Sequence, residues 1–232
     1  MKQHVQRLIE RAGYRLYREH PRDLAQPLPV ELATHRSLLR AVLEERAVTT
    51  VLDVGAHTGG YGALLRELGY AGEIVSFEPV AASFEVLSAR LDPLWRAQRL
   101  ALGRENGTLS LHVAHESNFT SFLTSDVAVD RIEEVEVRRL DEVAGGERIF
   151  LKTDTQGFDL EVIAGACGLL DRVVGLQVEL SVTPLYEGAP SWLDALRELR
   201  SLGFAATSLT GVGRRDLGAI EFDCLLVRDR AR

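Results

Sequence analysis

The stretch from Val51 to Gly60 most constrains how this chain can fold. It reads Val-Leu-Asp-Val-Gly-Ala-His-Thr-Gly-Gly and is followed by leucines at helical spacing, Leu64, Leu65 and Leu68. This order predicts a strand, a tight turn at Gly55 and the start of a helix. The first amides of such a helix carry unpaired N–H donors and a partial positive charge, which suit a carboxylate or a phosphate. The stretch therefore predicts a site for a nucleotide-like ligand.

Composition is typical of a soluble globular protein, with 232 residues, 46% of them hydrophobic and 26% charged. The formal net charge of −7 argues against a protein whose main role is nucleic-acid binding, because neutralising phosphates needs a concentrated basic surface. The two cysteines, Cys167 and Cys224, favour a reducing compartment. No apolar run approaches the roughly 18 residues that a membrane-spanning helix needs. We therefore expect a cytoplasmic protein that binds no nucleic acid.

Residues 1–31 are expected to form an N-terminal helix and linker ahead of a main domain at 32–232. The helix is predicted from basic residues at helical spacing, and the linker from three prolines: Arg7, Arg11, Arg15, Arg18, Pro21, Pro27 and Pro29. A basic helix could contact an anionic membrane or a glycosyltransferase, or it could be a solvated face packed on the domain. A second helix is expected from Leu32 to Arg46 at the sheet edge.

Strands and helices alternate along the main domain, which predicts a doubly wound α/β fold with a mostly parallel sheet. Further strands are expected at 73–77, 98–102, 149–154 and 173–180, and helices at 83–91, 158–168 and 192–202. The last two strands, 204–209 and 222–227, are separated by too few residues for a crossover helix. They should form an antiparallel hairpin at the sheet edge.

An insertion around 104–147 interrupts this alternation. Two strand-like segments, 107–113 and 135–140, flank a polar loop at 115–125. Insertions of this kind over the strand ends commonly cover a substrate site. The insertion is therefore predicted to act as a lid.

Glu78 is expected at the carboxyl end of the 73–77 strand, 23 residues after Gly55. This is close to the spacing at which a carboxylate in a nucleotide-binding βαβ unit accepts hydrogen bonds from ribose hydroxyls. The alternative is an exposed glutamate before the turn at Pro79.

The residues around Gly55 narrow the choice of ligand. A dinucleotide fingerprint needs glycine where this chain has His57, whose side chain would crowd a pyrophosphate. Asp53 would repel a diphosphate but suits a ligand with an ammonium and a sulfonium, such as S-adenosyl-L-methionine. Asp53 could hold its amino group directly or through water, the helix amides its carboxylate, and Glu78 its ribose. This cofactor is predicted, with a nicotinamide-dependent oxidoreductase as the weaker alternative.

Over residues 50–228 the chain resembles the FkbM-type methyltransferases, which have the S-adenosylmethionine-dependent class I methyltransferase fold. The resemblance rests on an ordered set of motifs. They are Asp-Val-Gly-Ala-His-Thr-Gly at 53–59, Phe-Glu-Pro at 77–79, Ala-Leu-Gly at 101–103, Leu-Lys-Thr-Asp-Thr-Gln-Gly at 151–157, Glu-Val-Ile-Ala-Gly-Ala at 161–166, Glu-Leu-Ser at 179–181 and Pro-Leu-Tyr-Glu-Gly at 184–188.

The resemblance implies a seven-stranded sheet with an antiparallel final strand, and O-methylation of a hydroxyl on a sugar, glycolipid, polysaccharide or related product. This chain has His57 where the family often has Asn, and Asp159 where Glu is usual. The predicted cofactor contacts are Asp53, Gly55, Ala56, His57, Thr58, Gly59, Glu78, Pro79, Ala101, Leu102 and Asp154.

Asp154 is the leading candidate for the group that accepts the hydroxyl proton or orients the acceptor, because ligands bind at the carboxyl ends of parallel strands. Its alternative role is a helix N-cap. Lys152 shares its strand face and could pair with it, and Glu179 and Gln156 are further candidates. The predicted acceptor contacts are Asn118, Thr120, Ser121 and Tyr186.

No metal is assigned, because the histidines and acids show no metal-ligand spacing. The second hypothesis for function is a catalytically silent scaffold subunit that keeps the cofactor site. The acceptor's identity and the oligomeric state are left open.

Overall fold

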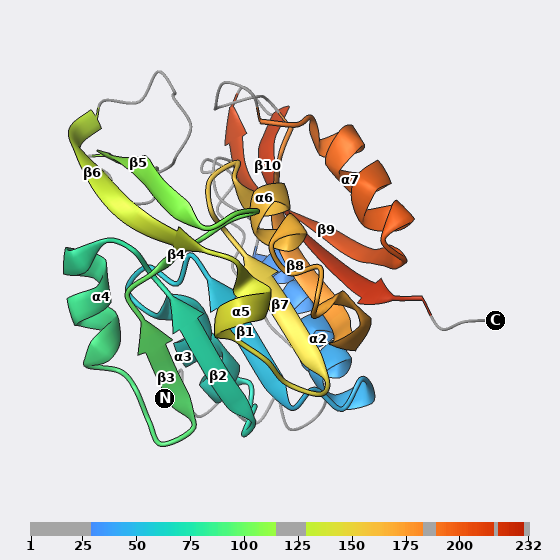
Figure 1. Cartoon of the computed structure of the whole chain (residues 1–232). Helices are drawn as coiled ribbons and strands as arrows, with labels where there is room; N and C mark the ends of the chain where they lie inside the picture. Colours follow the sequence, from blue (N-terminus) through green and yellow to red (C-terminus); the bar gives the residue numbers. More distant parts are fainter. Residues whose placement is uncertain (1–28, 115–128, 183–188, 216–217, 230–232) are drawn as a thin grey trace, which may run out of the picture.

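The computed structural model describes residues 29–114, 129–182, 189–215 and 218–229. Within these ranges seven strands form a main sheet of order β3-β2-β1-β7-β8-β10-β9, and three form a second sheet of order β4-β6-β5 (Figure 1). No helix in these ranges is long and apolar enough to cross a membrane.

The main sheet has the following bounds: β1 Thr50–Val54, β2 Glu73–Phe77, β3 Trp95–Gln98, β7 Ile149–Thr153, β8 Val173–Ser181, β9 Phe204–Arg215 and β10 Gly218–Arg228. The second sheet consists of β4 Ala101–Leu102, β5 Gly107–Ala114 and β6 Val129–Arg138. The helices are α2 Pro29–Glu45, α3 Gly60–Glu67, α4 Ala81–Ser88, α5 Leu140–Val143, α6 Asp159–Ala164, α7 Trp192–Ser201 and the short 3-10 helix η2 Leu170–Arg172.

The sheet is mostly parallel, and β10 is its antiparallel strand. Strands β3, β2, β1, β7 and β8 pair in parallel, whereas β10 pairs antiparallel with both β8 and β9. The crossover through α7 carries the chain past the position of β10 to form the edge strand β9, and the hairpin then returns between β9 and β8. The predicted doubly wound fold with an antiparallel edge hairpin is therefore confirmed.

Helices cover both faces of the sheet, so the central strands are nearly continuous apolar runs. On one face Val51 and Phe150 pack with Leu39 of α2 and Leu65 of α3. On the other, Leu151 belongs to the cluster that holds the apolar residues of α6 and α7. This alternation puts every second strand residue under α2 and α3.

The predictions for α2 are corrected in two respects. The helix begins at Pro29, within the range assigned to the linker, because proline is well tolerated in the first turn of a helix. It also packs on a face of the sheet rather than at its edge, since Leu39 and Leu43 join the cluster of Val51 and Phe150.

The predicted third strand at 98–102 is two strands in two sheets. β3 ends at Gln98, and Ala101 and Leu102 pair in parallel with Val137 and Arg138 of β6. The second sheet packs on Val80, directly before α4, so it lies near the carboxyl end of β2 (Figure 1). The 107–113 strand is present as β5, and the 135–140 strand is part of the longer β6.

Gly62 on α3 gives a test of this packing. A Cβ on Gly62 would lie 2.1 Å from the Trp95 ring, whereas one on Gly60 in the same helix would meet nothing within 4 Å. We expect Gly62→Ala to lower the free energy of unfolding by about 1 to 3 kcal/mol through overpacking. Gly60→Ala should leave it unchanged or raise it by up to about 1 kcal/mol. Urea unfolding measures both, and equal losses in the two variants would contradict the packing.

Candidate active site

The turn after β1 holds three strand ends together. Gly55 has a φ of 72°, and a Cβ there would lie 1.9 Å from the carbonyl oxygen of Asp154. The amides of Gly55 and Ala56 both donate to the carbonyl oxygen of Phe77, at 3.1 and 3.0 Å. The turn therefore touches the backbone after β7 and is anchored to the end of β2, and only glycine fits at position 55.

Glu78 lies at the carboxyl end of β2, as predicted, and its carboxylate accepts a hydrogen bond from the backbone of the turn. Its Oε2 accepts from the amide of His57 at 2.8 Å, and its Oε1 from the amide of Val80 at 2.8 Å. Burial raises the pKa of Glu78, and the two amides partly offset this. Each carboxylate oxygen has a further lone pair, so the group can still accept from ribose hydroxyls.

His57 adopts the left-handed conformation, with a φ of 49°. Asn and His are both enriched in this conformation among non-glycine residues. The departure from the family's Asn therefore keeps the shape of the turn. Burial lowers the pKa of His57, which favours the neutral ring. Thr58 is partly exposed, and Gly59, at a φ of 82°, leads into α3.

Asp53 lies beneath the turn and is fully buried. Its Oδ2 accepts from the hydroxyl of Ser76 at 3.0 Å, and its Oδ1 lies 3.2 Å from Nζ of Lys152. The structure thus gives Asp53 an internal role, and its predicted contact with the cofactor's amino group stays a prediction.

Lys152 is buried between Asp53 and Asp154, which confirms the predicted shared strand face. Its Nζ donates to the carbonyl oxygen of Gly55 at 2.8 Å and lies 3.6 Å from Oδ2 of Asp154. Burial alone would lower the pKa of this ammonium, but Asp53 and Asp154 raise it above its ordinary value. The ammonium therefore stays charged and ties the turn to Asp154.

Gln156 joins the two candidate carboxylates. It has a φ of 53°, and its Nε2 donates to Oδ1 of Asp154 at 3.2 Å and to Oε2 of Glu179 at 2.6 Å. The Asp154 side chain is 42% exposed, so a ligand can reach it. Burial, with Asp154 and Glu221 nearby, raises the pKa of Glu179 well above its ordinary value. The four predicted catalytic residues therefore form one connected group.

Asp154 does not cap α6, which was its alternative role. The residue before this helix is Phe158, and no side-chain cap is formed. Asp159, the family's usual Glu position, accepts from the amide of Thr155 at 3.2 Å and so closes the turn before the helix.

Two carboxylates of β10, Glu221 and Asp223, were not predicted from the sequence. Because β10 is antiparallel, its first half lies beside the end of β8, where Glu221 pairs with Ser181 and Asp223 with Glu179. Burial raises the pKa of both groups. The signal that could have found them is the acid-apolar-acid alternation across Phe222. With Asp154 and Glu179, they make this end of the sheet strongly acidic.

The remaining predicted contacts lie around this group or outside the described residues. The side chains of Ala101 and Leu102 pack into hydrophobic clusters, so a ligand contact from this segment would come from its backbone. Pro79 is partly exposed beside Glu78. The predicted acceptor contacts lie outside the described residues: Asn118, Thr120, Ser121 and Tyr186.

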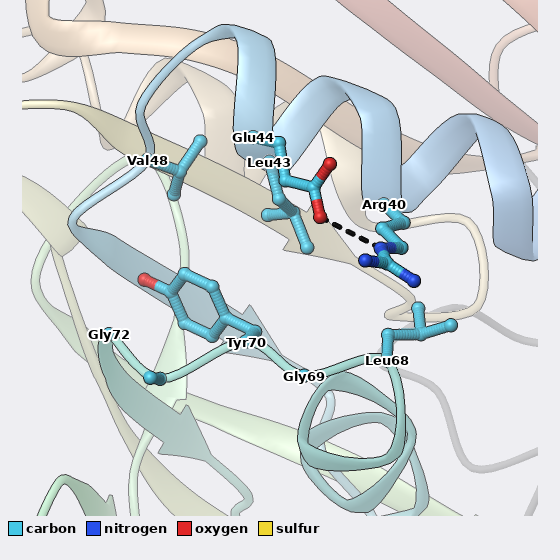
Figure 2. Close-up of a pocket in the computed structure, with 9 residues that line it drawn as sticks. Arg40, Leu43, Glu44, Val48, Leu68, Gly69, Tyr70 and Gly72 are labelled. Carbon is cyan, nitrogen blue, oxygen red and sulfur yellow. Dashed lines mark hydrogen bonds and ion pairs between the residues drawn. The ribbon is translucent and has the colours of Figure 1, made fainter.

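A hollow of about 170 Å³ lies at the opposite end of the sheet, where Val48 precedes β1 and Gly72 precedes β2. Figure 2 shows Arg40 and Glu44 of α2 above it, paired with each other at 2.8 Å. It is remote from the strand ends that form the site. Over the part of the chain that the structure describes, no group of His, Cys, Asp and Glu side chains could hold a metal.

Residues 53–205 match the family model described as Methyltransferase FkbM domain. The chain therefore belongs to this family and is an S-adenosylmethionine-dependent methyltransferase. This assignment confirms the predicted family and cofactor, and it replaces the oxidoreductase alternative.

The solved structures that this chain resembles are distant from it in sequence. An rRNA methylase from Streptococcus thermophilus is 14% identical, with 86% of this chain and 97% of that chain covered and a TM-score of 0.48. Magnesium protoporphyrin IX methyltransferase from Synechocystis PCC 6803, solved with bound SAM, is 12% identical, with 98% and 97% covered and a TM-score of 0.48. These likenesses carry no argument about the acceptor. A search of curated proteins found no match.

Asp159 predicts a pH dependence of stability. Burial, and then Asp154, raise its pKa from 3.8 to about 6. The folded chain therefore binds this proton more tightly than the unfolded chain, and the free energy of unfolding falls as the pH rises from about 4 to about 6. Asn at 159 cannot ionise but can still accept from Thr155. As the pH rises from about 4 to about 7, the free energy of unfolding of Asp159→Asn should therefore increase by about 1 to 3 kcal/mol relative to that of wild type.

Urea unfolding across this pH range measures the difference. Asp171→Asn, at an exposed carboxylate on η2, gives the baseline. A difference between Asp159→Asn and wild type that does not change with pH would contradict the raised pKa.

Proposed function

We propose that this methyltransferase acts on a hydroxyl of a sugar, glycolipid, polysaccharide or related natural product. The observation that carries the proposal is the accessible Asp154 carboxylate, held beside the Gly55 turn by Lys152 and Gln156. A hydroxyl must lose its proton as its oxygen is methylated, and a positioned carboxylate can accept that proton.

The residues of the turn fit the cofactor. Bound S-adenosylmethionine supplies a methyl group on a positively charged sulfur. Glu78 would accept hydrogen bonds from its ribose, and the amides at the start of α3 would face its carboxylate. The Asp154 carboxylate gives the positive sulfonium a favourable environment.

Asp154 is assigned the role of proton acceptor. Gln156 donates to its Oδ1 and Lys152 faces its Oδ2, so the carboxylate is held in one orientation. Fixing both reactants in line is the main contribution that a protein makes to such a displacement. Glu179 shares the Gln156 amide with Asp154, so it is assigned a supporting role.

The charge of the site supports a neutral hydroxyl compound as the acceptor. Glu179, Glu221 and Asp223 lie beside Asp154, and the nearby ammonium of Lys152 is already paired with Asp53. Burial and the neighbouring acids raise the pKa of all three groups, so this side of the site already disfavours negative charge and would disfavour a phosphorylated acceptor. A sugar-like acceptor carries many hydroxyls without a negative charge and agrees with this environment.

Transfer from labelled S-adenosylmethionine to fractionated glycan and glycolipid extracts tests the proposal. We expect label in a hydroxyl of a product. Asp154→Asn should reduce transfer at least about 100-fold, because general-base catalysis contributes that much or more. Its affinity for S-adenosylhomocysteine, measured by calorimetry, should stay within about threefold. Asp171→Asn serves as the control, and Asp154→Asn with wild-type transfer would contradict the assigned role.

Two further expectations stay predictions. The basic N-terminal helix, with its membrane or glycosyltransferase contact, lies outside the described residues. The cytoplasmic location is the second of these predictions.

A further inference from the structure

A row of buried polar side chains crosses the centre of the sheet beneath the cofactor turn. Ser76, Asp53, Lys152 and Gln177 stand in register on β2, β1, β7 and β8. Each is at most 5% exposed. Burying such groups costs free energy unless each finds a partner, so the partners show what the row does.

The ammonium of Lys152 is the centre of this row. It has three N–H donors. Its Nζ lies 2.8 Å from the carbonyl oxygen of Gly55, 3.2 Å from Oδ1 of Asp53, 3.4 Å from the carbonyl oxygen of Val54 and 3.6 Å from Oδ2 of Asp154. These oxygens belong to the turn and to the groups around it, so a shift of the ammonium would move the turn relative to Asp154.

The aromatic ring of Tyr61 bounds the ammonium on a further side. Nζ of Lys152 lies 5.5 Å from the ring centroid, within the range of a cation–π contact. Tyr61 is the second residue of α3, directly after the glycines of the turn. It therefore connects the start of this helix to the ammonium.

The hydroxyl of Tyr61 is itself anchored. It donates to Oε1 of Gln177 at 2.9 Å, and Nε2 of His35 lies 3.2 Å from the same oxygen. The hydroxyl of Thr210 lies 3.2 Å from Nδ1 of His35. Since the Gln177 oxygen can only accept, Nε2 of His35 donates to it. Residues of β8, α2 and β9 thus hold Tyr61 in place.

We propose that Tyr61 is a positioning residue of the cofactor site. It acts through Lys152: its anchored ring keeps the ammonium against the Gly55 carbonyl, and so sets the shape of the turn that receives the cofactor. The inference rests on the assignment of this turn as the cofactor site. Tyr61 need not touch the cofactor itself.

Calorimetry with S-adenosylhomocysteine tests the proposal without a known acceptor. Tyr61→Leu, which removes the ring, should weaken binding at least about tenfold, as expected when less than about a tenth of the molecules keep the turn in its binding shape. Tyr61→Phe keeps the ring and loses only its hydroxyl anchor, so binding should weaken by no more than about threefold. Tyr61→Met is measured beside them, because it fills more of the volume without a ring and carries the test if the Leu variant does not fold.

Tyr70→Leu is the matched control. Tyr70 is a partly buried tyrosine just after the other end of α3. It lines the hollow at the other end of the sheet and donates to the carbonyl oxygen of Glu73 at 3.3 Å (Figure 2). This variant should lose stability and keep wild-type affinity. Equal weakening of binding by Tyr70→Leu would overturn the proposal.

Nitrogen-15 NMR of labelled lysine gives a readout that a merely structural role would not move. We expect the buried Lys152 ammonium to give a slowly exchanging signal in wild type and Tyr61→Phe, and to lose it in Tyr61→Leu or Tyr61→Met. Unchanged affinity and an unchanged signal in the ring-less variants would overturn the role of Tyr61 alone. A wild-type chain that binds no S-adenosylhomocysteine would overturn the cofactor site as well.

Discussion

The ion pair between Asp53 and Lys152 is the interaction on which the candidate site depends. The two side chains project from the central strands β1 and β7 and are buried, and an unpaired charge there would cost several kcal/mol. Ser76 satisfies one oxygen of Asp53, and the Gly55 carbonyl accepts from Lys152. Replacing such a pair by apolar residues is often neutral for stability. The ion pair is therefore better explained by its positioning of the turn than by a contribution to stability.

This position decides which groups meet at the strand ends. The turn at Gly55 contacts the backbone of Asp154 and is hydrogen-bonded to the last residue of β2, directly before Glu78. Gln156 then links Asp154 to Glu179 on β8. The antiparallel β10 adds carboxylates beside Glu179, because the first half of β10 lies next to the carboxyl end of β8. The carboxyl ends of the parallel strands thus bring the glycine turn together with a cluster of acidic side chains.

Local patterns predicted the parts of this arrangement that depend on neighbours in the chain. The glycine turn, Glu78 after β2 and Asp154 after β7 each follow an apolar strand directly, and strand alternation put Lys152 and Asp154 on one face. Contacts between distant segments could not be read in this way. The division of 98–102 between two sheets depends on pairing with Val137 of β6, and the anchoring of Tyr61 depends on Gln177, which is 116 residues away. A polar residue inside an apolar strand, as in Ser76 and Gln177, was the available signal.

The structure of the complex with S-adenosylhomocysteine tests the central claim most directly. We expect the ribose hydroxyls at hydrogen-bond distance from the Glu78 carboxylate, the amino-acid end of the ligand over the Gly55 turn, and the sulfur on the side of the turn that faces Asp154. The Lys152 ammonium should remain on the Gly55 carbonyl beneath the ligand. A ligand whose ribose lies away from Glu78, or whose sulfur is remote from Asp154, would contradict the assignment of the site.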